Sequence, residues 1–176
     1  MGQPPTITRR HFLAAGGAGL AALGIAARWV EPDRVVVTRH MIGEPSNGVP
    51  ALRLVQLTDL HLQGVGAHEE RVARAVRGLA PDILLLTGDA IDRRDRLEVL
   101  AGFLTLLPRS IPLYATLGNW EHWAEVDLAG LAAVYGRHGA RLLVNESVRV
   151  EHAGRAMLLT GLDDNTAGRP DLSLAL

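Results

Sequence analysis

Three short polar clusters carry the side chains of this sequence that are best suited to bind metal ions. They are Thr58-Asp59-Leu60-His61, Thr87-Gly88-Asp89-Ala90-Ile91-Asp92 and Leu117-Gly118-Asn119-Trp120-Glu121-His122. Their carboxylate, imidazole and amide donors suit Mn, Fe or Zn rather than soft metals. A carboxylate such as Asp89 can bridge two ions, and the neutral amide of Asn119 can complete a second site without adding charge. The clusters therefore indicate chemistry at a metal site.

Each cluster follows an apolar stretch that reads as a strand. We expect strands over residues 52–57, 82–86 and 111–117, alternating with helices over 69–80, 95–107 and 121–138. This alternation predicts right-handed βαβ units and an α/β fold with a mainly parallel sheet. Because ligands of such sheets lie beyond the carboxyl ends of the strands, the three clusters should meet at one edge.

The spacing within the clusters predicts some local geometry. Asp59 and His61 are two residues apart, so on an extended strand end they would point the same way and reach one ion. Gly88 and Gly118 allow sharp turns and close approach of a ligand. Further strands are expected over residues 34–41, 141–144, 148–152 and 156–160.

The three motifs together identify a family resemblance. Asp59-x-His61, Gly88-Asp89-x-x-Asp92 and Gly118-Asn119-x-Glu121 resemble the motifs of the calcineurin-like metallophosphoesterases, and the resemblance covers about residues 34–176. It implies a metallophosphatase-like βαβ sandwich and a site for two divalent metal ions. By this resemblance Asp59 and His61 bind the first metal, Asp89 bridges, and Asn119 binds the second. Asp92 would order its loop.

The reaction that the resemblance implies is hydrolysis of a phosphoester, by a phosphodiesterase or phosphatase. In such sites two metals about 3.5–4 Å apart clamp the phosphate and activate a water or hydroxide for in-line attack. Their charge stabilises the negative charge that develops.

One departure from the family pattern concerns the proton donor. The family usually has His after the Asn, whereas this chain has Trp120. His122 is the candidate catalytic residue in its place, provided that the loop turns it inward. On a regular helix the two-residue shift rotates the side chain by about 200°, away from the site, which leaves a solvent-facing helix residue as the alternative. In the family pattern Glu121 would orient the His that is missing here, and the alternative is a first-turn acid favoured by the helix dipole.

A second departure concerns the far end of the sequence. The family carries further histidines, including a Gly-His-x-His pair, but this sequence has no His after His152. We therefore expect the second sheet to be incomplete and the second metal to keep only Asp89 and Asn119. Zinc-like ions usually take four ligands, so the expectation is either a fragment or a truncated gene product.

Two other polar runs have open interpretations. Arg93-Arg94-Asp95-Arg96 can bind an anionic substrate or form a solvated charge run. Asp163-Asp164-Asn165 can face the site or form an Asx-type turn.

The first 27 residues resemble an export signal. Thr8-Arg9-Arg10-His11-Phe12-Leu13 leads into an apolar run from Phe12 to Ala27, whose sixteen residues fall short of the about twenty that a membrane span needs. This pattern is typical of a twin-arginine signal over residues 1–27, ahead of a domain at 34–176. The expected partner is the twin-arginine translocase, and the expected location is the periplasm, cell wall or exterior. An uncleaved signal that anchors the protein to the membrane is the alternative.

Composition limits the remaining classes of function. The chain has 176 residues, a net charge of −1 and no cysteine. A nucleic-acid partner would need a basic face, so none is expected, and disulfides or a Cys nucleophile are excluded. Three hypotheses remain: an exported phosphoester hydrolase, a non-catalytic metal- or envelope-binding protein, and a hydrolase of lipid-linked pyrophosphates at a membrane or cell-wall surface.

Overall fold

The computed structural model of the protein describes residues 35–43 and 50–176. The chain divides into two compact units, Met1–Thr38 and Arg39–Leu176, and the fold described here is that of the second. The predicted export signal over 1–27 lies outside the described residues. The strand predicted over 34–41 is wrong, because residues 35–41 form no strand and Val36 and Val37 are exposed. A β-branched run forms a strand only where it can pair and pack.

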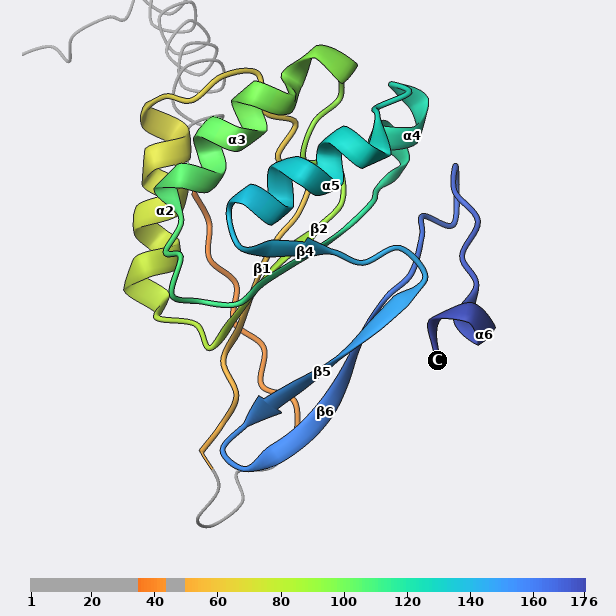
Figure 1. Ribbon diagram of the computed structural model, residues 1–176. Coiled ribbons are helices and arrows are strands. Elements are labelled where there is room, and N and C mark those ends of the chain that lie inside the picture. Colours follow the sequence, from red (N-terminus) through yellow and green to blue (C-terminus); the bar gives the residue numbers. More distant parts are fainter. Residues whose placement is uncertain (1–34, 44–49) are drawn as a thin grey trace, which may run out of the picture. The chain divides into compact units, whose positions relative to one another are not determined.

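Four parallel strands form the central sheet in the order β1-β2-β3-β4 (Figure 1). They are β1 (Leu54–Leu57), β2 (Ile83–Thr87), β3 (Leu113–Thr116) and β4 (Ala140–Leu142). Leu57 pairs with Leu86 and Thr87 with Thr116, so β1, β2 and β3 end in register. The polar clusters that follow these three strands therefore emerge at one edge of the sheet, as the sequence predicts.

Helices cover one face of this sheet (Figure 1). They are α2 (Ala67–Leu79), α3 (Leu97–Leu106) and α5 (Leu128–Arg137). Alternate strand residues such as Leu84, Leu86 and Ala115 are buried on that side, together with Phe103 of α3 and Leu131 of α5. Removal of these apolar side chains from water is the main force that holds the layer together.

The other face of the sheet carries a two-stranded antiparallel hairpin of β5 (Glu146–His152) and β6 (Arg155–Gly161). A small cavity of about 90 Å³ between the layers is lined by Leu85 and Tyr114 from the sheet and by Leu159 and Gly161 from β6. A parallel sheet with a short second sheet is thus the α/β sandwich that was expected. The last element is α6 (Leu172–Ala175), and no helix among the described residues is long and apolar enough to cross a membrane.

The predicted helix over 121–138 is wrong in one respect, because it is two helices. The short α4 (Asn119–Trp123) ends before Glu125, whose φ is 50°, and α5 begins after Asp127. The Asp127 carboxylate accepts hydrogen bonds from the N–H groups of Ala129 and Gly130 at 3.2 and 3.1 Å. Such an N-cap starts a new helix, so Asp127 overrides the apolar periodicity that runs through it. The helix predicted from residue 95 likewise begins as a 3-10 turn, η1 (Arg94–Arg96).

The hairpin meets the central sheet at a position where no side chain fits. A Cβ added to Gly161 would lie 2.8 Å from the carbonyl oxygen of Leu143 and closer still to the Leu143 Cβ. Leu143 is buried just after β4. The absence of a side chain at Gly161 therefore allows β6 to approach Leu143 and the central sheet closely.

We expect Gly161→Ala to lower the free energy of unfolding by about 1–3 kcal/mol, because overpacking forces the hairpin away from Leu143. The matched control is Gly78→Ala in α2, where an added Cβ meets nothing within 4 Å. That change should stabilise the protein by about 0.5–1 kcal/mol, since Ala favours helix over Gly. Urea unfolding followed by circular dichroism measures both, and equal effects would contradict the close contact.

Candidate metal centre

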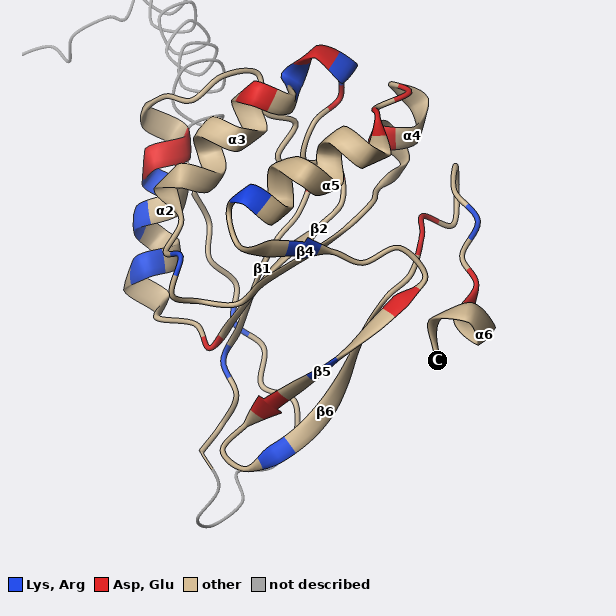
Figure 2. Ribbon diagram, viewed as in Figure 1, with Lys and Arg blue, Asp and Glu red and all other residues tan. Residues whose placement is uncertain are grey.

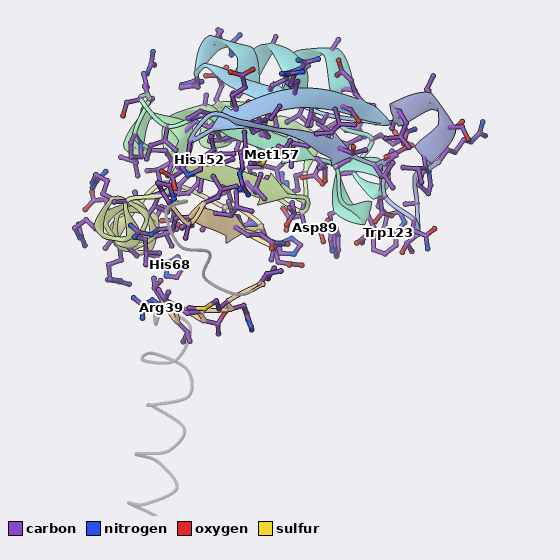
Figure 3. The ribbon with its side chains drawn as sticks, turned by 90° about the horizontal axis from the view of Figure 1, so that it is seen from below. Arg39, His68, Asp89, Trp123, His152 and Met157 are labelled. Atoms are coloured by element: carbon purple, nitrogen blue, oxygen red, sulfur yellow. The ribbon has the colours of Figure 1, made fainter. Side chains whose placement is uncertain are left out.

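Asp59, His61 and Asp89 come together at the carboxyl edge of the sheet. Each offers one ligand atom, and these three atoms lie within 4.8 Å of one another. Asp89 is largely buried, whereas Asp59 is exposed and His61 is intermediate, so the group opens to solvent on one side. Two carboxylates and an imidazole in this arrangement fit a divalent ion such as Mn, Fe or Zn. Figure 3 labels Asp89 near α4.

The backbone at these three positions is not extended. Asp59, His61 and Asp89 have φ angles of 53°, 41° and 52°, in the left-handed region. The expectation that Asp59 and His61 point the same way from an extended strand end is therefore wrong in its geometry, although both do reach one place. Left-handed backbone is uncommon for residues other than Gly and persists only where the surroundings hold it.

Backbone hydrogen bonds join the loop after β1 (the first loop) to the loop after β2 (the second loop). The N–H groups of His61 and Leu62 donate to the carbonyl oxygens of Asp89 and Ala90 at 2.9 and 3.0 Å. The Asp59 N–H donates to Gly88 O at 3.3 Å. These bonds continue the pairing of β1 and β2 beyond the sheet, and they hold the turned backbone that brings the three ligands together.

The second loop also contacts the third loop, which follows β3. A Cβ on Gly88 would lie 2.6 Å from the backbone N and Cα of Gly118, so two glycines are required where these loops touch. Trp120 N–H donates to Asp89 Oδ1 at 2.9 Å. Asn119 lies between Gly118 and Trp120 and so has its backbone beside Asp89. Its role as a ligand of a second ion stays a prediction.

The buried carboxylate of Glu121 holds the second and third loops together. Its Oε2 accepts from the N–H groups of Asp89 and Gly118 at 3.0 and 2.9 Å, and its Oε1 accepts from Ala90 and Ile91 at 2.7 and 3.3 Å. Glu121 is only 2% exposed. A buried charge is costly unless it is fully hydrogen-bonded, and these four donors satisfy it. Glu121 thus fixes the backbone on which Asp89 stands.

Asp92 supports the first loop from the side. The Gln63 side-chain amide lies 2.9 Å from both carboxylate oxygens of Asp92 and also donates to His61 O at 3.1 Å. These contacts tie the loop after β2 to the loop after β1, and the expectation that Asp92 orders its own loop stays a prediction.

An exposed row of aromatic rings adjoins the three ligands. The ring of Trp120 lies edge-on to that of His61, with centroids 5.6 Å apart, and edge-on to that of Trp123 at 5.4 Å. Trp120 and Trp123 remain 40% and 58% exposed. Trp120 thus places an exposed indole ring against His61 at the position where the family usually has an imidazole.

His122 faces a different partner from the three ligands. It lies within α4, and its Nε2 is 2.7 Å from Asp163 Oδ1. Asp163 also accepts from the N–H groups of Asp164 and Arg169, both at 2.8 Å. The Asp164 carboxylate accepts from two further N–H groups, which confirms the Asx-type turn. The catalytic role of His122 stays a prediction.

The pair of His122 and Asp163 has an electrostatic consequence. Burial acts to raise the pKa of Asp163, but the Arg169 N–H, the His122 side chain and the Asp164 N–H together hold that pKa below its usual value. The carboxylate therefore stays charged and ties α4 to the loop after β6.

Fold and site together define a metallophosphatase-type α/β protein, and comparison with known proteins gives the family. Residues 52–167 match the Calcineurin-like phosphoesterase family, so the chain belongs to that family. This span includes every residue of the three clusters, and the resemblance seen in the motifs is confirmed.

Three bacterial relatives illustrate the similarity, two of them named metallophosphoesterases and one a pyrophosphatase. The metallophosphoesterase YkoQ of Bacillus subtilis is 32% identical over 137 residues, which cover 74% of this chain and 51% of YkoQ. YkuE of the same organism is 26% identical over 94% of this chain and 63% of YkuE. The UDP-2,3-diacylglucosamine pyrophosphatase LpxG of Chlamydia trachomatis is 35% identical over 57% of this chain and 32% of LpxG. The chain therefore spans less than two thirds of each of these relatives.

Sequence reasoning missed two positions that the structure shows to be important. The four hydrogen bonds of Glu121 were not foreseen, although Glu121 stands three residues after the N-cap Gly118, a position from which a Glu side chain can accept the N-cap N–H, as it does here. The contact of His122 with Asp163 joins residues 41 apart in sequence, and no local pattern announces it.

We expect Glu121→Gln to lower the free energy of unfolding by about 3 kcal/mol, because an amide turns two donors toward buried N–H groups and removes the charge. Urea unfolding measures the loss. The control is Glu98→Gln on the exposed side of α3, which should stay within about 0.5 kcal/mol of wild type. Similar values for the two variants would contradict the clamping role of Glu121.

Asp163→Asn should lower the free energy of unfolding at pH 7 by about 1–2 kcal/mol, because it weakens charged hydrogen bonds. The folded-state pKa of Asp163 is depressed, so its contribution is complete above about pH 5 and is lost as pH falls through the folded value. Wild type and variant should therefore converge in urea titrations as the pH falls from about 5 through the folded pKa, which lies below 3.8. A difference that does not change with pH would rule out the ionised carboxylate as the cause.

Proposed function

We propose that the protein is a metal-dependent hydrolase of phosphoesters. The observation that carries the proposal is the convergence of Asp59, His61 and Asp89 within 4.8 Å at the carboxyl edge of the sheet. Membership of the Calcineurin-like phosphoesterase family supports the reaction class. The proposal includes a second ion held by Asp89 and Asn119.

The chain's own residues hold this site in a fixed geometry. Asp59, His61 and Asp89 are the candidate ligands of the first ion, and Thr58 Oγ1 donates to Asp59 Oδ2 at 2.7 Å, which orients that carboxylate. The backbone N–H of Trp120 donates a hydrogen bond to one carboxylate oxygen of Asp89. Bound divalent ions would supply positive charge for the phosphate oxygens and lower the pKa of a nucleophilic water.

His122 is proposed as the residue that carries a proton to the leaving group. The carboxylate of Asp163 is hydrogen-bonded to Nε2 of the His122 ring, so the proton would be delivered from Nδ1. Asp163 would then act as the orienting partner of the imidazole, in the way that carboxylates orient catalytic histidines.

A second candidate function is hydrolysis of a lipid-linked pyrophosphate. Similarity to the UDP-2,3-diacylglucosamine pyrophosphatase LpxG favours it, because a pyrophosphate is cleaved by the same phosphoryl chemistry. A panel of phosphodiester, phosphomonoester and pyrophosphate substrates separates the two candidates.

We also propose that the protein is exported through the twin-arginine translocase to act in the cell envelope. Arg9-Arg10 followed by the apolar run to Ala27 supports this location.

Asp89→Asn should reduce hydrolysis of bis(p-nitrophenyl) phosphate by the complete gene product at least about 100-fold, because it removes the charge of a central ligand. Bound Mn should fall in parallel, as measured by inductively coupled plasma spectrometry. Glu98→Gln removes a negative charge from an exposed position and should leave both unchanged. Full turnover without Asp89 would refute the proposed site, and metal uptake without turnover in wild type would favour a binding protein.

A further inference from the structure

The row of exposed rings leads from the candidate metal ligands into a groove. Trp120 contacts His61 on one side and Trp123 on the other. Trp123 in turn lines a groove of about 620 Å³, with residues 92–95 on one wall and residues 123–125 on the other. Asp92 lies on the first wall, three residues after Asp89. Trp123 thus belongs both to the row of rings that begins at His61 and to the lining of the groove.

The rim of this groove is charged. Arg94 faces Glu125 across it at 4.0 Å, and Arg93 forms an ion pair with Asp95 at 2.9 Å along its wall. Figure 2 shows the acidic and basic residues side by side at the turn before α3. All four side chains are more than half exposed, so these pairs are weak and open readily to another hydrogen-bonding group.

We propose, on the basis of the proposed function, that Trp123 stacks on a nucleobase-like heteroaromatic ring of the phosphoester substrate while its phosphate lies at Asp59, His61 and Asp89. Trp120 separates the two binding positions, and a pentose is of comparable length to this single ring. Trp123 is thus a residue that determines specificity, and the charged rim supplies hydrogen bonds to the edge of the bound ring.

The composition of the groove argues for a ring rather than an acyl chain. Apart from Trp123, its only apolar lining residue is Ala124. A long acyl chain needs a continuous apolar surface, since its binding energy grows with the apolar area it buries. A heteroaromatic ring needs aromatic surface to stack on and polar groups around its edge, and Trp123 is 58% exposed beside such groups.

The test compares two esters that release the same leaving group, thymidine 5′-(p-nitrophenyl phosphate) and methyl p-nitrophenyl phosphate, with the complete gene product and Mn²⁺. Trp123→Ala should raise KM for the thymidine ester about tenfold, the effect typical of one lost base stack, and leave kcat nearly unchanged. KM for the methyl ester should change less than about twofold, because this ester has no base to stack.

Two matched variants distinguish a stacking ring from simple apolar contact. Trp123→Phe keeps an aromatic face and should keep most of the affinity for the thymidine ester, whereas Trp123→Leu keeps apolar bulk without that face and should behave like Trp123→Ala. Equal rescue by Leu and Phe would overturn the proposal. A KM increase for a decyl p-nitrophenyl ester in place of the thymidine ester would overturn it as well.

A binding measurement keeps the inference separate from the proposed activity. By calorimetry with Mn²⁺, thymidine monophosphate should bind wild type about tenfold more tightly than ribose 5-phosphate, and Trp123→Ala should abolish this difference. Wild type that hydrolyses neither ester but shows this preference would sink the hydrolase proposal and support the stacking site. Equal binding of both phosphates would overturn the stacking site whatever the turnover.

Discussion

The buried carboxylate of Glu121 is the interaction on which the rest of the site depends. It accepts four backbone hydrogen bonds from two loops that leave neighbouring strands, and Asp89 stands on one of those loops. Backbone N–H groups at strand ends have no ladder partners, and water is excluded here. A single charged side chain therefore replaces the missing partners and fixes the distance between the second and third clusters. The positions of Asp89 and Trp120 depend on it directly, and those of Asp59 and His61 depend on it through their backbone bonds to the second loop.

The parallel sheet explains why ligands sixty residues apart can meet at all. Each strand ends in register with its neighbour, so three short loops reach the same edge. The loops then hold one another through backbone bonds and through the contact of Gly88 with Gly118. The helices behind the sheet contribute no candidate ligand, and their part is to bury the apolar face that keeps the strands aligned. The loops thus carry the candidate ligands, and the helices and sheet form the apolar core that stabilises the fold.

Sequence periodicity predicted most of the fold because apolar strands and amphipathic helices follow local rules. Three parallel strands, their order of motifs and the edge at which Asp59, His61 and Asp89 meet all followed from it. It failed where local signals compete: Asp127 starts a new helix inside an apolar pattern, and the Val35–Val37 run pairs with no strand among residues 35–43 and 50–176. The hydrogen bonds of Glu121 and the contact of His122 with Asp163 depend on tertiary approach, which a linear pattern does not encode.

The left-handed backbone of Asp59, His61 and Asp89 restricts how this site can change during evolution. Asp, Asn and His tolerate that conformation better than β-branched residues do. A residue at each of these positions must therefore meet two requirements: it must supply a ligand atom, and it must tolerate the left-handed backbone conformation. A lineage that loses the metal can exchange these residues for Asn or Gly without unfolding the loops, whereas Val or Ile is closed to it. Relatives that have lost the metal ligands should consequently keep the backbone conformation of these loops.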